Sequence, residues 1–333
     1  MRQSSVWPAI GSAALALILF MMILQLGNST TKILMPTATK ISVVPEALDD
    51  LDDIVNHHVN KTNIVGGISK AQWSAINSYG RKLVLDAAST LSREDAATMK
   101  LEDIYGLFTE SYDCDNNLYS RLGGESGDGG KWICGEYFKN SSDTVVVSVG
   151  SSGNFKFEDA VIAHSPDIKI HTFDCTGNWS HPPVVFEPWC LSGEDKVMGD
   201  GKIYKLWPSL LRDAGIPKVD LLKIDIEGYE WATIPHLLRN STYEQLPRQI
   251  SIELHLWKKF LDGSTVGVPA DYLAFNLDQS YSAIAFDYLH PTISLFQDFF
   301  AAGYEIAAAE MNPESAPAAC CSEYTFVLLP KSK

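Results

Sequence analysis

Basic residues are scarce in this chain and form no cluster. Lys and Arg number 26 against 41 Asp and Glu, which gives a formal net charge of -15 and a pI near 4.9. Binding to a phosphate backbone depends on grouped Lys and Arg side chains, so a nucleic acid is not an expected partner. A small or glycan-like substrate fits this composition better.

Two further features are missing. No CxxC pair of the zinc-binding kind occurs among the six cysteines, so a structural zinc site is not expected. Disorder throughout is excluded as well, because 46% of the residues are hydrophobic. A chain of 333 residues can therefore hold one large globular domain with appendages.

The amino-terminal stretch carries no charge between Arg2 and Lys32. Residues 7–26 are apolar apart from Ser12 and Gln25, about the length needed to cross ~30 Å of hydrocarbon. We therefore predict a transmembrane signal anchor at 7–26, preceded by a cytoplasmic tail at 1–6 and followed by a Ser/Thr-rich stem at 27–45. A cleaved signal peptide, which would give a secreted form, is the alternative.

Acceptor sequons for N-glycosylation lie beyond this stretch, at Asn28, Asn60, Asn140, Asn178 and Asn240. All six cysteines lie there too, and an even number suits an oxidising compartment. The sequence thus predicts a disulfide-containing glycoprotein, a single-pass membrane protein of the secretory pathway with its domain in the Golgi or ER lumen. Helical patterns at 46–111 predict a helical extension before that domain. The oligomeric state stays open.

Two apolar runs end in groups that can do chemistry. The run Val219 to Ile226 predicts a strand buried on both faces, and it ends in Asp225 and Glu227. A second predicted strand, Ile250 to Trp257, carries Glu253 and His255 at the same spacing. Ligands bind outside the carboxyl ends of parallel strands, so we expect these four side chains to converge at one edge of a sheet.

A glycine turn follows an earlier predicted strand, Thr144 to Val149. Gly150 and Gly153 separate that strand from a predicted helix at 157–163. A strand, a glycine turn and a helix in this order are typical of a cofactor-binding site, because the ligand can approach the glycine backbone and the free N–H groups of the helix. The next predicted strand ends in Asp174, 24 residues after Gly150, where a carboxylate can accept ribose hydroxyls of a nucleoside-containing cofactor. The simpler interpretation is an acid that caps a loop.

The remaining patterns complete an α/β sheet. Val184 to Phe186 predicts a third strand that leads into 189–195, and Cys175 and Cys190 then follow neighbouring strand ends, which makes a disulfide between them a candidate among 15 pairings. Helices are predicted at 229–239 and 291–302, the latter opened by Pro291, and strands at 304–308 and 324–329. Seven strands with interleaved helices predict a doubly wound sheet.

These blocks together resemble a known family. Ser148 to Glu158, Phe173-Asp174, Trp189 to Ser192 and above all Asp220 to Gly228 are similar to methyltransferase-like domain family 22 and to the broader FkbM-type methyltransferases. The resemblance spans about 112–330. It implies a Rossmann-like class I methyltransferase fold and S-adenosylmethionine as cofactor. One departure is Ser148, which stands where many class I enzymes have an acid.

The resemblance also implies roles for individual residues. Gly150, Ser151 and Gly153 would lie along the methionine part of the cofactor, Asp174 on its ribose, and Leu191 and Ser192 near its adenine. Methyl transfer to oxygen usually requires a base, for which His255 and Asp225 are the candidates, with Glu227 and Glu253 orienting the base or the acceptor. A divalent metal held by the same residues is a second, less supported mechanism.

The sequence is also compatible with two other functions. A metal-dependent glycosyltransferase in the lumen could use Asp225 and Glu227 to hold a cation and a nucleotide diphosphate. A domain that kept the fold without turnover could bind a partner or a glycan, and Ser148 favours that interpretation.

Overall fold

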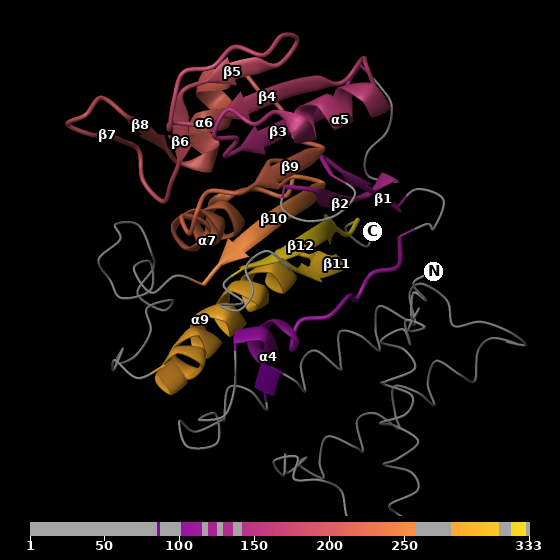
Figure 1. Ribbon diagram of the computed structural model, residues 1–333, viewed down its shortest axis with the longest axis vertical. Coiled ribbons are helices and arrows are strands. Elements are labelled where there is room, and N and C mark those ends of the chain that lie inside the picture. Colours follow the sequence, from indigo (N-terminus) through magenta and orange to yellow (C-terminus); the bar gives the residue numbers. More distant parts are fainter. Residues whose placement is uncertain are drawn as a thin grey trace, which may run out of the picture. The chain divides into compact units, whose positions relative to one another are not determined.

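The structure is a computed structural model, and it describes residues 85–86, 101–114, 119–124, 129–135, 142–256, 281–312 and 321–330 (Figure 1). The chain divides into two units, 1–49 and 50–333, and all described residues belong to the second. The predicted tail, anchor and stem lie outside the described residues. Of the predicted helical extension, only 85–86 and 101–111 are described, and they include helix α4 (Leu101–Tyr105).

A seven-stranded sheet forms the centre of the second unit, in the order β11-β12-β10-β9-β3-β4-β5 (Figure 1). Its strands are β3 (Val145–Val149), β4 (Lys169–Phe173), β5 (Val185–Glu187), β9 (Leu221–Ile224), β10 (Gln249–His255), β11 (Tyr304–Met311) and β12 (Cys321–Leu328). Only β12 runs antiparallel to its neighbours. The predicted doubly wound, seven-stranded α/β sheet is confirmed.

Both faces of the sheet are covered, which explains why the central strands β3 and β9 are mostly apolar. All five residues of β3 are buried, and their side chains alternate between two cores: Val145, Val147 and Val149 join one, and Val146 joins the other. The first core is closed by α4 and by three further helices. These are α6 (Trp207–Ala214), α7 (Glu230–Asn240) and α9 (Tyr281–Ala301).

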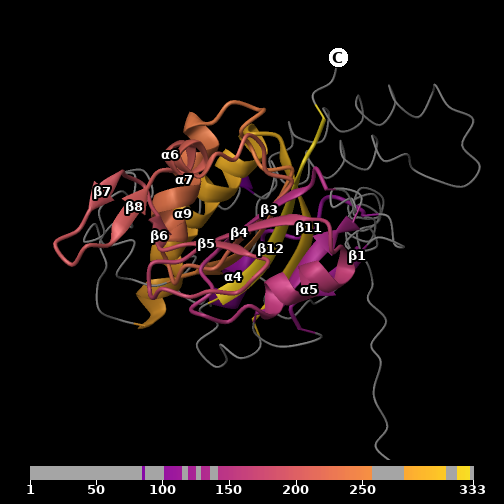
Figure 2. The same ribbon diagram turned by 90° about the horizontal axis from the view of Figure 1, so that it is seen from above.

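The opposite face is covered by helix α5 (Lys156–His164) and by a hairpin of β1 (Tyr119–Leu122) and β2 (Lys131–Cys134) (Figures 1 and 2). Strand β2 lies against β10 and β12. Polar residues occupy this part of the sheet face. Ser251 and Thr325, for example, both donate hydrogen bonds to the backbone carbonyl of Trp132.

A second, small sheet of order β6-β8-β7 lies beside β4 and was not predicted. Its strands, β6 (Trp189–Leu191), β7 (Lys196–Val197) and β8 (Ile203–Lys205), have two or three residues each, too few for a periodic pattern. The predicted disulfide between Cys175 and Cys190 is present and ties β6 to the end of β4. A second disulfide joins Cys114 to Cys134.

The helices differ from the predictions in two places. Helix α9 begins ten residues before Pro291, which therefore lies inside the helix rather than at its first turn. Proline has no N–H, so the helix lacks one backbone hydrogen bond at Pro291. Burial of the neighbouring Leu289, Ile293 and Phe296, which are almost inaccessible to solvent, offsets this loss. Helix α6 was not predicted, although Pro208 in its first turn and Gly215 in the left-handed conformation at its end mark its limits.

The prediction of a single-pass membrane protein in the secretory pathway is corrected. Within the ranges that the structure describes, no helix is both long enough and apolar enough to cross a bilayer. The longest of them, α9, contributes Leu289, Ile293 and Phe296, among others, to the core. Residues 7–26, on which the prediction rested, are not among the described ones. The glycosylation prediction is untested; Asn178 and Asn240 are exposed.

Candidate active site

The glycine turn and Asp174 meet at the carboxyl ends of β3 and β4. The Asp174 carboxylate accepts hydrogen bonds from the backbone N–H groups of Ser151 and Ser152, at 2.7 and 2.6 Å, through Oδ2. Its other oxygen, Oδ1, accepts from the N–H and the hydroxyl of Thr176, both at 2.7 Å. Burial would raise the pKa of Asp174, but the bonds from Thr176, Ser152 and Ser151 hold it below its ordinary value.

This carboxylate therefore holds the turn in place. Asp174 lies at the glycine turn, as predicted. The contacts of its carboxylate are those of an acid that caps a loop, which was the simpler interpretation. Ribose hydroxyls could reach Oδ1 only by replacing the bonds from Thr176, because a carboxylate offers about four acceptor positions.

The two glycines of the turn are required by close neighbours. Gly150 has a φ of +80°, and a Cβ there would overlap the backbone carbonyl of Asp225. A Cβ on Gly153, with φ +76°, would lie 2.6 Å from Nε1 of the Trp179 indole. Both φ values lie in the region that favours glycine. The turn is thus packed against the candidate catalytic strand on one side and against an aromatic ring on the other.

Leu191 is the last residue of β6 and Ser192 follows it, and both are buried. The Cys175–Cys190 disulfide joins the residue before Leu191 to the residue after Asp174. The predicted adenine-side residues and the predicted ribose-side residue therefore lie on neighbouring strand ends, as the predicted pocket requires.

Asp225 lies beside the glycine turn through backbone contacts. Its N–H donates to the carbonyl of Val149 at 3.0 Å, so the carboxyl ends of β3 and β9 are bound together at this point. The neighbouring Lys223 is buried and donates from Nζ to the carbonyl of Gly150. Burial would raise the pKa of Asp225, but Lys223, Lys131 and His255 hold it below its ordinary value.

Lys131 is the centre of a buried ionic network that the sequence did not reveal. Its ammonium group contacts Glu323 and lies 3.6 Å from Asp225 and 3.8 Å from Glu253. Glu253 and Glu323 are directly opposed on β10 and β12, an unfavourable placement for two like charges. Burial raises the pKa of Glu323 to about 8, with Glu253 and Asp225 adding to the rise and Lys131 opposing it.

His255 lies among three carboxylates, one of which, that of Asp225, it shares with Lys131. Its Nδ1 is 3.2 Å from Oε1 of Glu230, and its Nε2 is 4.0 Å from Oδ1 of Asp225 and 3.8 Å from Oε2 of Glu227. Burial alone would lower the pKa of His255, but Glu230 together with Glu253 and Asp225 raises it to about 9. The imidazole therefore carries a proton at neutral pH, and as such cannot act as a base there.

The structure thus brings Asp225, Glu227, Glu253 and His255 to one rim, as predicted, and adds partners that the sequence did not indicate. Lys131 comes from the β1–β2 hairpin, Glu230 from α7 and Glu323 from β12. Asn312 also donates to Glu253 at 2.8 Å. No motif marks these positions, and the sequence around Lys131, Glu230 and Glu323 gives no local signal that they meet.

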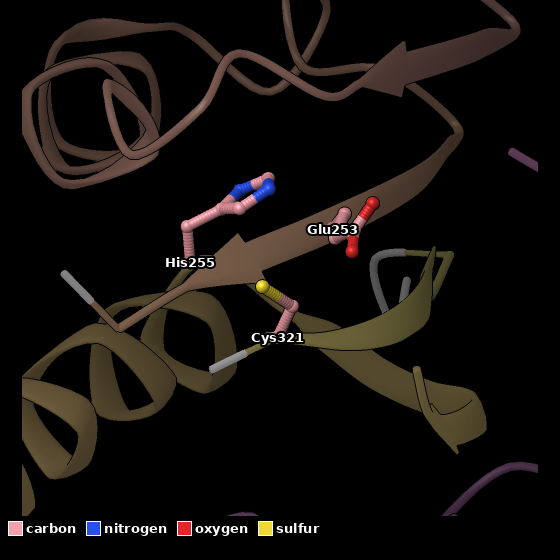
Figure 3. Close-up of side chains that lie close together, drawn as sticks. All are labelled: Glu253, His255 and Cys321. Carbon is pink, nitrogen blue, oxygen red and sulfur yellow. The ribbon is translucent and has the colours of Figure 1, made fainter. Parts of the chain in front are cut away.

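Two groups of side chains at this rim have spacing that could hold a metal ion. One is Glu253, His255 and Cys321, and the other is Asp225, Glu227 and His255. Figure 3 shows the first group, with Glu253 and His255 on β10 and Cys321 on the neighbouring β12. Cys321 is disulfide-bonded, so it has no thiolate to offer as a ligand.

The ionic network predicts how stability depends on pH. The ordinary pKa values of Glu323 and His255 are 4.5 and 6.5, and folding raises them to about 8 and about 9. Between these limits the folded chain keeps protons that the unfolded chain releases, so the free energy of unfolding should fall as the pH rises from 4.5 to 9. We expect a slope of about 1.4 kcal/mol per pH unit for each such proton.

Urea unfolding across this range measures the effect. Glu323→Gln should flatten the curve between pH 4.5 and 6.5, reduce its slope by one proton up to about pH 8, and leave the contribution of His255 between 6.5 and about 9. The lowered pKa values of Asp174 and Asp225 act only below 3.8, outside this window. A stability that rises with pH over this range would contradict the assigned charge states.

The strand order and the convergence of a glycine turn with acids at the carboxyl ends of β4, β9 and β10 define a Rossmann-like class I methyltransferase fold. A family model described as a methyltransferase domain, Methyltransf_22, matches residues 68–287, which is more than half of the chain. The chain belongs to this family. It is thus a methyltransferase by class, and S-adenosylmethionine is the methyl donor of that class. The resemblance seen in the sequence is confirmed, and the glycosyltransferase alternative loses its basis.

Similarity to individual proteins is distant. No curated protein matches the chain at a significant level. Among solved structures, fibrillarin in its complex with Nop5p and the fibrillarin of Methanococcus jannaschii both have 10% identity and a TM-score of 0.33. Both matches cover 57% of this chain, with 74% and 69% of the fibrillarin chains. The O-methyltransferase NcsB1 has 11% identity and a TM-score of 0.26, covering 58% of this chain and 51% of its own. Scores this low carry no argument about function.

Proposed function

We propose that this methyltransferase transfers the methyl group of S-adenosylmethionine to an oxygen of a small-molecule or glycan acceptor. The observation that supports this best is the contact between the glycine turn and Asp225: Gly150 tolerates no side chain because the Asp225 carbonyl lies against it. A donor bound along the turn would therefore lie beside the acids at the ends of β9 and β10.

The residues around the turn fit the cofactor. The hydroxyl of Ser148, at the end of β3, is buried and has no hydrogen-bond partner within the described part of the chain. A polar group of a ligand placed at this strand end would supply the missing partner. We assign Gly150, Ser151 and Gly153 to the methionine side, Leu191 and Ser192 to the adenine side, and Asp174 to holding the turn and, after release of Thr176, to the ribose.

When bound, S-adenosylmethionine supplies a methyl group attached to a positively charged sulfur. The chain has to hold the acceptor oxygen in line with that group and receive its proton. His255 is already protonated at neutral pH, so we assign the proton to the ionised carboxylate of Asp225. His255 and Lys131 then position that carboxylate, and Glu227, which is exposed, faces the acceptor.

A second candidate, a methyltransferase fold that binds without turnover, is favoured by two observations. The Asp174 carboxylate is fully engaged by the turn and by Thr176. The Trp179 ring lies against Gly153 and Gly177, where it occupies space beside the turn. A chain of this kind would keep the acidic rim and bind no donor.

Calorimetric titration of the full-length chain with S-adenosylmethionine separates the two. The wild type should bind one equivalent, and Asp174→Asn should weaken binding by roughly 10–100-fold, because charge-assisted hydrogen bonds of ~1.5–3 kcal/mol that hold the turn are lost. Asp200→Asn, an exposed acid paired with Lys202, is the matched control and should bind normally. Absence of saturable binding to the wild type would favour the second candidate.

A further inference from the structure

The side chains of Asp225, Glu227 and His255 surround a common point at the carboxyl ends of β9 and β10. One ligand atom from each lies within 4.8 Å of the others. The distances from His255 Nε2, 4.0 Å to Asp225 Oδ1 and 3.8 Å to Glu227 Oε2, exceed that of a good hydrogen bond. They suit three ligands that share a cation at about 2.0–2.2 Å from each.

The other nitrogen of His255 is oriented as in metal centres. Nδ1 lies 3.2 Å from Oε1 of Glu230, a carboxylate with no exposed surface. Metal-ligating histidines regularly donate their second N–H to such a carboxylate, which fixes the ring and directs the remaining nitrogen to the metal. The same Glu230 oxygen accepts from the N–H of Ile226 at 2.9 Å, so Glu230 also fixes the turn that carries the two acidic ligands.

Glu230 is itself incompletely satisfied. Its second oxygen, Oε2, is buried without a hydrogen-bond partner among the residues that the structure describes. A buried carboxylate beside two further acids is costly unless positive charge compensates it. The protonated His255 supplies part of this charge, but it faces Oε1 of Glu230 rather than Oε2. Lys131 faces Oδ2 of Asp225 and two other carboxylates. The oxygen of Asp225 that faces His255 is Oδ1, on the other side of that carboxylate.

We infer that Asp225, Glu227 and His255 bind a divalent cation, which displaces the proton from Nε2 of His255, with Glu230 as the residue that positions the imidazole ring. One imidazole nitrogen with two carboxylate oxygens favours Mn²⁺ or Zn²⁺ over Mg²⁺ and Ca²⁺, which prefer oxygen ligands alone. The neighbouring group with Cys321 is the poorer site because that sulfur is in a disulfide. The exposed side chain of Glu227, at 69%, leaves coordination positions open to solvent.

Such a cation would have a use in methyl transfer. It could take an acceptor oxygen as a further ligand and lower the pKa of that hydroxyl. The proton would then pass to water or to Oδ2 of Asp225, because Oδ1 is the oxygen that faces His255 and the cation. This use rests on the proposed function, whereas binding of the cation does not. The two are therefore tested separately.

Titration of the full-length chain with Mn²⁺, without S-adenosylmethionine, tests the site. The paramagnetic resonance signal of free Mn²⁺ should disappear as one equivalent binds. Glu227→Gln, at an exposed position, should keep the fold and weaken binding at least about ten-fold, and Glu230→Gln should weaken it by about 10–100-fold. Glu194→Gln, an exposed acid paired with Lys196, is the control and should leave the affinity unchanged.

Each outcome decides the proposal. Saturable binding that is weakened in both variants and preserved in the control supports the site, and displacement of Mn²⁺ by Zn²⁺ but not by equimolar Ca²⁺ supports the choice of ion. No saturable binding at millimolar Mn²⁺, or the same affinity in Glu227→Gln and Glu230→Gln as in the wild type, overturns it. Because no methyl donor is present, a chain that binds Mn²⁺ but not S-adenosylmethionine would fail the proposed function alone.

Discussion

Replacing Asp225 with asparagine is expected to slow methyl transfer by about 10²–10⁴-fold, the range for loss of a positioned proton-transfer group. Asparagine has nearly the same shape, and the backbone bond from residue 225 to Val149 would persist. The change removes the carboxylate that lies between Lys131 and His255. Transfer of a labelled methyl group from S-adenosylmethionine to a panel of hydroxyl-bearing small molecules and glycans measures the effect.

The control for this variant is binding of the donor. S-adenosylmethionine affinity should stay close to that of the wild type, because Asp225 contacts the glycine turn through its backbone carbonyl rather than its carboxylate. Asp200→Asn should transfer methyl groups at the wild-type rate. An Asp225→Asn chain of full activity would remove Asp225 from the catalytic assignment, and one that no longer binds the donor would show that the carboxylate acts on the pocket instead.

Lys131→Met is expected to lower the free energy of unfolding by about 3–5 kcal/mol, as for removal of one partner from a buried ionic group. Methionine retains most of the apolar stem, so the change isolates the loss of charge. The carboxyl groups of Asp225, Glu253 and Glu323 would lose the Lys131 ammonium group that they share. Denaturant unfolding near neutral pH measures the difference.

Lys196→Met is the matched control, since Lys196 makes an exposed ion pair with Glu194, and it should cost less than about 1 kcal/mol. Adding Glu323→Gln to Lys131→Met should change the stability little near neutral pH, because the pKa of Glu323 is about 8 and its carboxyl group is already mostly protonated there. If Lys131→Met cost no more than the surface variant, the buried network would not contribute to stability in the way its geometry indicates.

The sequence by itself determined the sheet and the class of protein. Strands buried on both faces favour near-continuous apolar runs, which made β3 and β9 predictable from the sequence. In β10 the apolar residues alternate with polar ones, and the polar residues Glu253 and His255 marked its end. The same logic located Asp174, Asp225 and His255, because polar side chains that follow such runs mark strand ends. The Cys175–Cys190 disulfide was foreseeable for the same reason, since neighbouring parallel strands end at one edge.

Only the tertiary structure decided the charges and the partners at the site. Lys131 and Glu323 are 192 residues apart. They come together because the short β1–β2 hairpin packs on the sheet, and no periodic pattern in the sequence predicts that contact. The raised pKa of His255 depends on Glu230 in a helix, and the engagement of Asp174 depends on how the turn closes around it. Strand patterns follow from local burial, whereas protonation states depend on the sum of charges and burial from distant segments.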